Sequence, residues 1–179
     1  MCIRHLKGCI KMAYKGLTKE KLEKDIKAAL SLLYVHDGSL IEKDVNERCL
    51  SARLCAYLMQ LTCFDTAYNG LDWDPEYNRV GEAIHVKRLG VHAIIPDIIL
   101  HQRFTHANNI CLIEFKKRSV DIACICNDLT KCGKLTDSTK LSYLTGNETE
   151  FKYRYGLHIV LNKDSPKLCW YCAGEPLGK

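Results

Sequence analysis

The sequence contains no apolar run that approaches the ~18 residues needed to span a bilayer. It also lacks an internal repeat, a low-complexity tract and a linker rich in proline or glycine, which favours a single domain. A strong excess of one charge is missing as well, because 26 Lys and Arg residues against 21 Asp and Glu residues give a net charge of +5. That charge permits a polyanionic partner but falls short of the strongly basic surface of a dedicated nucleic-acid coat protein.

What is present fits one globular domain. The 179 residues are 47% hydrophobic and 26% charged, close to the average of globular proteins, which excludes wholesale disorder. We expect residues 18–179 to form a single domain and residues 1–17 to form an N-terminal extension. The sequence leaves open whether this extension is flexible. Positive residues interrupt the apolar residues before Met12, so no signal-peptide core is expected there, and Met12 stays an alternative start.

The chain has eleven cysteines, and only Cys169 and Cys172 have the separation of a metal-binding or redox pair. Several of the others lie in apolar stretches, where a free cysteine packs as a small hydrophobic residue. We therefore expect thiols rather than a disulfide framework, and a cytoplasmic location. A zinc site is not favoured, because a structural zinc ion commonly takes two such pairs and the sequence has one.

The hydrophobic pattern predicts helices combined with short buried strands. Thr18 is placed to cap the first helix, Asp37-Gly38 indicates a turn after it, and Ser119 is placed to cap a late helix. The second helix has apolar residues on two sides, which is typical of a buried helix. Helices are expected over 18–34, 40–61 and 120–135. Strands are expected over 71–79, 93–102, 110–116, 155–162 and 167–173. The order predicts an α/β fold with a mixed central sheet flanked by helices.

Two of the expected strands carry charges that a protein core tolerates poorly. Asp97 follows Ile94-Ile95-Pro96, and Glu114 and Lys116 close an apolar run. Residues two apart on a strand share a face, so Glu114 and Lys116 point the same way with Phe115 opposite. Carboxylates from neighbouring strands suit Mg²⁺, and a lysine beside the ion can hold or activate an attacking water. The alternative is an ordinary surface ion pair of Glu114 with Lys116, which is common for a single tripeptide of this kind.

An acid on the second expected helix completes this set. Glu47 shares the apolar stripe of Leu50 and Leu54, where a carboxylate needs a reason to be buried. Glu42 and Asp44 are rival acids on the same helix. Helical phase favours Glu47, because Asp44 lies nearer the helix start, where an acid is ordinary.

This combination resembles the PD-(D/E)XK nuclease superfamily, which has the restriction-endonuclease-like fold, and within it a group of small microbial proteins. The resemblance covers roughly residues 20–165 and is carried by five segments. They are Glu47-Arg48, Glu76-Tyr77-Asn78-Arg79, the segment 95–103 around Pro96-Asp97, the segment 113–117 around Glu114-Phe115-Lys116, and the segment 153–157. It implies an αβββαβ core, and the expected order of elements is compatible with that core.

The resemblance also implies a role for each site residue. Asp97 and Glu114 are expected to bind Mg²⁺ or Mn²⁺, with the carbonyl of Phe115 as a third ligand. Lys116 is expected to position or polarise the hydrolytic water. Glu47 is expected to bind the metal or orient its water, with a second ion as an open alternative.

Basic residues around these acids predict contact with a polyanion. Arg79, Arg103 and Lys117 lie in a segment where cations outnumber acids, and Lys131 and Lys134 follow on the late helix. Such contacts hold phosphates and read no bases, so no sequence specificity is expected. Two alternatives stay open, namely a solvated basic surface and a structural network that pairs Glu76 with Arg79.

These residues together predict a metal-dependent nuclease that hydrolyses phosphodiester bonds of DNA without strong sequence specificity. The alternative is a subunit of a defence or mobile-element system that binds nucleic acid or a partner with little cleavage of its own. A homodimer or a partner subunit is possible in either case, and no membrane is expected. The sequence leaves open DNA against RNA, single against double strands, and internal against terminal cleavage.

Overall fold

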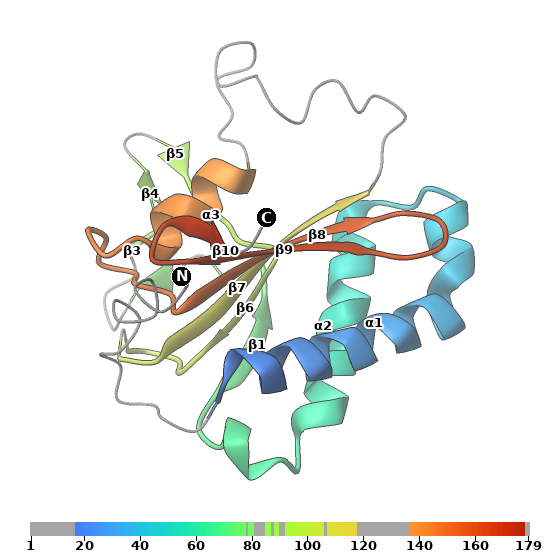
Figure 1. Cartoon of the computed structure of the whole chain (residues 1–179), viewed down its shortest axis with the longest axis horizontal. Coiled ribbons are helices and arrows are strands. Elements are labelled where there is room, and N and C mark those ends of the chain that lie inside the picture. Colours follow the sequence, from blue (N-terminus) through green and yellow to red (C-terminus); the bar gives the residue numbers. More distant parts are fainter. Residues whose placement is uncertain are drawn as a thin grey trace, which may run out of the picture.

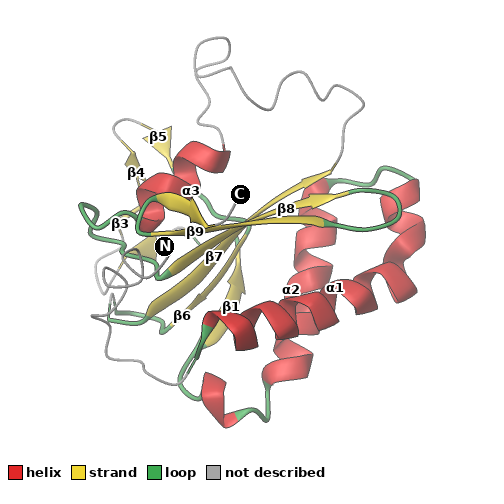
Figure 2. Ribbon diagram, viewed as in Figure 1, coloured by secondary structure: helices red, strands yellow, loops and turns green. Residues whose placement is uncertain are grey.

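The computed structural model describes residues 17–77, 79–80, 85–86, 88–89, 92–105, 107–117 and 137–177. Figures 1 and 2 show helices arranged around a twisted central sheet. The described helices are α1 (Lys19–Glu42), α2 (Glu47–Thr62), the short 3-10 helix η2 (Thr66–Tyr68) and α3 (Asp137–Thr145).

Within the described residues, the central sheet has six strands in the order β1-β6-β7-β8-β9-β10. These strands are β1 (Asp72–Pro75), β6 (Ile98–His101), β7 (Asn109–Lys117), β8 (Tyr155–Leu161), β9 (Lys167–Cys172) and β10 (Glu175–Leu177). The pair β7 and β8 is parallel and the other pairs are antiparallel. Two small ribbons pair β2 (Arg79–Val80) with β3 (His85–Val86) and β4 (Arg88–Leu89) with β5 (His92–Ala93).

Apolar side chains from the two faces of the sheet form two cores. Alternate residues of β7 such as Ile113 and Phe115 pack with α1 and α2, whereas Leu112 packs with Leu141 and Leu144 of α3. The sheet is therefore covered on one face by α1 and α2 and on the other by α3, as the ribbon shows (Figure 1). Because β7 is covered on both faces, its residues from Asn109 to Phe115 are all buried.

The first helix begins where the sequence predicts but runs further. The hydroxyl of Thr18 accepts a hydrogen bond from the Lys21 backbone N–H, which confirms the expected cap. The expected turn at Asp37-Gly38 is wrong, because α1 continues to Glu42. Asp37 is buried and accepts hydrogen bonds from Arg53 Nε at 2.9 Å and the Tyr57 hydroxyl at 2.7 Å. Contacts with α2 thus override the local turn signal.

The second helix is shorter and less buried than the sequence predicts. It starts at Glu47 rather than near residue 40, because Asn46 caps it by accepting a hydrogen bond from the Arg48 N–H, after Asp44 adopts a left-handed conformation with φ of 55°. The expectation of two buried sides is wrong. The buried residues form one stripe that includes Leu50 and Leu54, and Met59 on another side is 51% exposed.

The longest strands match the sequence pattern best. The expected strands 110–116, 155–162 and 167–173 are confirmed as β7, β8 and β9, within one or two residues. The expected strand 93–102 pairs in the sheet only from Ile98 to His101, because Pro96 has no N–H to donate. The expected strand 71–79 pairs in it only over β1. The helix expected over 120–135 lies outside the described residues. Neither α3 nor β10 was predicted from the sequence.

The prediction of a mixed α/β fold is confirmed, with helices on both faces of a mixed sheet. Leu17, which was assigned to the N-terminal extension, is 1% exposed and belongs to the core. Buried thiols such as Cys55 and Cys111 pack among apolar residues as expected, and burial raises the pKa of Cys55 to about 12. Cys172 departs from that expectation because it is disulfide-bonded. None of the described helices combines the length and the hydropathy of a membrane span.

Candidate functional site

A row of polar residues crosses the sheet where β7 ends and β6 begins. Ile98 pairs with Ile113, so Asp97 and Glu114, the next residues outward, lie opposite each other. Glu114 in turn pairs with His158 on β8, and His158 pairs with Cys169 on β9. On the other side, the Glu76 N–H donates to the Asp97 carbonyl at 3.0 Å. We call Glu76, Asp97, Glu114, His158 and Cys169 the polar row.

Asp97 is fixed against the backbone of the neighbouring strand. Its Oδ2 accepts a hydrogen bond from the Phe115 N–H at 2.7 Å. The carboxylate thus takes the place of a backbone carbonyl just before β6 begins, which satisfies a backbone donor of a buried strand. The contact also places the carboxylate beside both Glu114 and the peptide group of Phe115, the residues that the sequence analysis grouped with it.

Glu114 is the most buried acid of the polar row, at 1% exposure. Its Oε2 accepts from Lys140 Nζ at 2.9 Å, and Lys140 reaches it from α3. A buried carboxylate needs such a cation, since an unpaired charge in this position is costly. Lys140 was not among the residues predicted from the sequence. The available signal was a lysine on the apolar stripe of Leu141 and Leu144, the same signal that singled out Glu47.

Glu47 comes to the end of β7 from the first turn of α2. Its Oε1 accepts from the Lys117 N–H at 2.9 Å, and its Oε2 lies 3.3 Å from Lys116 Nζ. The expectation that Glu47 sits on the buried stripe is wrong, because its side chain is 32% exposed and it opens the helix. These contacts nevertheless bring Glu47 to Lys116, another residue of the predicted site.

The donors at this end of the sheet are hard oxygen atoms. Asp97 and Glu114 supply carboxylates from neighbouring strands, which fits Mg²⁺ because this ion is often held by one or two carboxylates and several waters. Among the residues that the structure describes, no group of three or more His, Cys, Asp or Glu side chains is placed to hold a metal ion. Glu47 therefore does not join Asp97 and Glu114 in one ligand cluster, and its contacts are with lysines instead.

The basic residues expected to hold phosphate are less well gathered. Arg103 lies past the far end of β6 from Asp97, where its Nε donates to Asp74 Oδ2 at 2.8 Å and its second nitrogen also contacts Asp74. His101 Nε2 lies 3.0 Å from the same Oδ2. Burial alone would raise the pKa of Asp74, but the hydrogen bonds from Arg103 and His101 outweigh it and hold this pKa below its usual value. Arg103 is thus part of a structural network remote from the polar row.

Lys117 is close to the site but is already engaged. Its Nζ donates to Asp44 Oδ1 at 2.7 Å and to the Val45 carbonyl, which ties β7 to the loop between α1 and α2. Glu76 pairs with Arg48, Oε1 to Nε at 2.8 Å. The alternative that pairs Glu76 with Arg79 is not tested, because the Arg79 side chain lies outside the described residues, as do Lys131 and Lys134.

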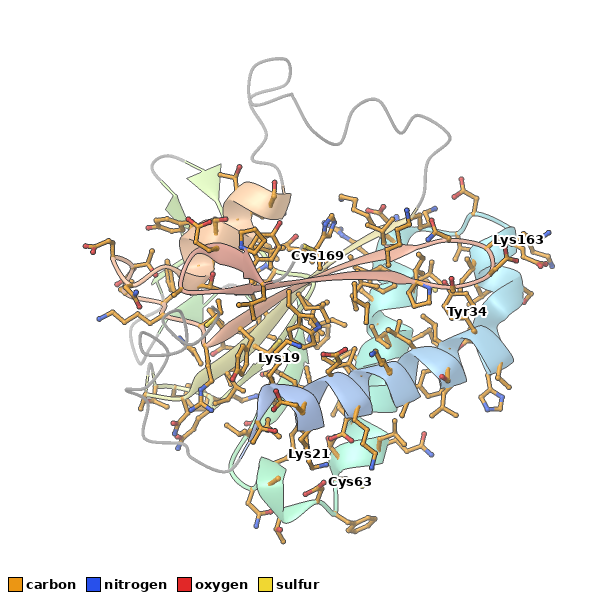
Figure 3. All side chains as sticks on the ribbon, in the orientation of Figure 1. Lys19, Lys21, Tyr34, Cys63, Lys163 and Cys169 are labelled. Atoms are coloured by element: carbon orange, nitrogen blue, oxygen red, sulfur yellow. The ribbon has the colours of Figure 1, made fainter. Side chains whose placement is uncertain are left out.

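A pocket of about 450 Å³ adjoins the site on the side of Lys117. It lies between the end of α1, the end of β7 and the turn from β8 to β9, and Figure 3 labels Tyr34 and Lys163 in this part of the molecule. The Tyr34 hydroxyl donates to the Asn162 carbonyl at 2.7 Å and fixes that turn. The polar lining is Glu42, Asp44, Lys117, Asn162 and Lys163.

Comparison with protein-family models gives no match, and comparisons with curated proteins and with solved structures likewise give none. The function is therefore inferred from the geometry of the site.

Proposed function

We propose that this protein is a metal-dependent nuclease, with the restriction-endonuclease-like core, that hydrolyses phosphodiester bonds of DNA without strong sequence specificity. The observation that carries the proposal is the pairing of β6 with β7. It sets Asp97 opposite Glu114, with the Asp97 carboxylate 2.7 Å from the Phe115 N–H, and leaves Lys116 on the same strand two residues further on. Two carboxylates and a lysine in this arrangement suit phosphodiester hydrolysis.

Each residue has a role that its contacts allow. Asp97 and Glu114 would hold Mg²⁺ or Mn²⁺, with the Phe115 carbonyl as a further oxygen donor. The bound ion supplies positive charge for the phosphate and lowers the pKa of a water. Lys116, whose side chain is 47% exposed, would orient the attacking water from the solvent side. Glu47, whose Oε2 lies 3.3 Å from Lys116 Nζ, positions that lysine.

A second candidate is a module that binds nucleic acid or a partner protein with little cleavage of its own. The observation that favours it is the neutralisation of the acids by lysines, Glu47 by Lys116 and Glu114 by Lys140. A site in which acids such as Glu47 and Glu114 are already paired with lysines can be structural. The two candidates differ in their requirement for metal.

The purified protein should be incubated with circular single-stranded DNA, plasmid DNA and RNA, each with Mg²⁺, with Mn²⁺ and with EDTA. We expect cleavage of DNA that EDTA abolishes. Glu114→Gln and Lys116→Ala should each lower the rate by about a hundredfold or more, as is typical for loss of an electrostatic or proton-transfer group.

The matched control is Lys167→Ala, which removes an exposed lysine from β9 and should cleave as wild type does. Cleavage that survives EDTA, or that survives in both site variants, would refute the proposed site. Folded wild-type protein that binds Mn²⁺ and DNA but cuts neither DNA nor RNA would support the binding module instead.

A further inference from the structure

The Lys140–Glu114 pair differs from the other ion pairs of the site in its burial. The side chain of Glu114 is 2% exposed and that of Lys140 is 21% exposed, with 2.9 Å between Nζ and Oε2. By contrast, the side chains of the Lys116–Glu47 pair are 47% and 32% exposed. Lys140 is thus the cation that accompanies the most buried acid of the polar row, and it comes from α3 rather than from the sheet.

The surroundings of Glu114 make this lysine important. Asp97 lies opposite it before β6, His158 lies beside it on β8, and Lys116 is two residues along β7. With Glu76 next to Asp97, three acids follow one another across the row. Burial leaves little water around Glu114, so the Lys140 ammonium at 2.9 Å is the cation that balances its charge.

We propose that the Lys140 ammonium occupies the place of the divalent cation in the metal-free protein and is exchanged for it when metal binds. This inference depends on the proposed metal site. The ammonium balances the charge of Glu114 and holds its Oε2 at 2.9 Å while no metal is present. A lysine suits such an exchange, because its point charge sits on a flexible four-carbon stem, whereas an arginine would hold the carboxylate by a rigid fork.

The exchange also gives Lys140 a second partner. Once the divalent ion holds Glu114, the ammonium is repelled by it and turns outward, where the phosphate of a nucleic acid is the available anion. Metal binding and nucleic-acid binding therefore favour each other, since each benefits when Lys140 leaves Glu114. Lys140 acts here as a positioning residue for the metal ligand and as a contact for the substrate.

The test measures Mn²⁺ affinity by isothermal titration calorimetry at pH 8. We expect Lys140→Met to bind Mn²⁺ about tenfold more tightly than wild type, because the fixed competitor is gone. Lys140→Arg keeps the ion pair and should stay within about threefold of wild type or bind Mn²⁺ more weakly. Lys24→Met removes an exposed lysine of α1 and serves as the charge control.

The second measurement is the affinity for a short single-stranded oligonucleotide with Mn²⁺ present, in a Lys116→Met background that prevents the expected cleavage. Here Lys140→Met should bind about fivefold more weakly, since one phosphate contact is lost. Opposite signs for metal and oligonucleotide support the exchange. A purely structural lysine would weaken both, and that result would overturn the inference.

Failure of this inference can be separated from failure of the proposed function. If wild type binds Mn²⁺ and Glu114→Gln abolishes that binding, the metal site stands. Unchanged or weaker Mn²⁺ binding by a folded Lys140→Met, checked by circular dichroism, would then overturn the exchange alone. If wild type binds no Mn²⁺, both proposals are overturned.

Discussion

The buried pair of Glu114 and Lys140 predicts an asymmetric effect on stability. Lys140→Met leaves a carboxylate whose side chain is 2% exposed without its ammonium, and we expect a loss of about 3 kcal/mol in the free energy of unfolding. Glu114→Leu leaves an ammonium whose side chain is 21% exposed and can turn to water, so we expect a loss of about 1 kcal/mol. The double variant replaces the pair by apolar residues of similar volume and should lie within about 1 kcal/mol of wild type.

Urea denaturation of the four proteins at pH 7, followed by circular dichroism, measures these free energies as a double-mutant cycle. The expected coupling between the two positions is about 3 kcal/mol, far above the few tenths expected of independent sites. The m-value should not change, since no variant alters the surface exposed on unfolding by much.

Two results would refute this reasoning. A double variant whose loss equals the sum of the single losses would mean that the two side chains do not interact in solution. A Glu114→Leu variant less stable than Lys140→Met would mean that the carboxylate is the better solvated partner, contrary to the burial in the structure.

Two further predictions concern the fold and its pH dependence. Gly156→Ala should lose about 1–3 kcal/mol of stability, because the added Cβ would lie 2.9 Å from Leu141 Cδ2 and 3.1 Å from Thr145 Cγ2. Gly38→Ala in α1 should gain about 0.5–1 kcal/mol, because a Cβ there would have no atom within 4 Å and alanine favours a helix. Thermal melts should show the opposite shifts, and a stabilised Gly156→Ala would contradict the packing of α3 on β8. The lowered pKa of Asp74 contributes stability above about pH 4, and this stability is lost as the pH falls through the pKa of the folded state. The difference in urea midpoint between wild type and Asp74→Asn should therefore shrink from pH 7 to pH 3. A difference that is constant with pH would contradict this prediction.

The sequence predicted the long central strands because their signal is local. The run from Ile110 to Ile113 is apolar on both faces, and only a doubly covered strand tolerates that pattern. The predicted boundary between the first two helices was wrong, because contacts between residues distant in the sequence determine where α1 ends. Asp37 looks like a turn residue next to glycine, but Arg53 and Tyr57 of α2 bind its carboxylate and keep it within α1.

The site was also predicted only in part, because some of its contacts join residues that are distant in the sequence. Asp97 and Glu114 were grouped from the expectation of neighbouring strands, and the register sets them opposite each other. Lys140 was missed because it lies 26 residues from Glu114 in the chain and no local pattern links the two. Arg103 was expected to bind phosphate from charge alone, but charge does not reveal that Asp74 already holds it.

Lysines that accompany carboxylates account for several features of this site together. Asp44, Glu47 and Glu114 each contact a lysine. Two of these lysines, Lys116 and Lys117, are consecutive at the end of β7. Acids gathered at one end of a sheet would repel one another. Lysines offset that repulsion and still leave the acids accessible to a metal ion. Their flexible ammonium groups can be displaced by a stronger cation or attracted away by a phosphate. If the proposed metal site is used, the cations that pair with its acids before the metal arrives must be able to leave.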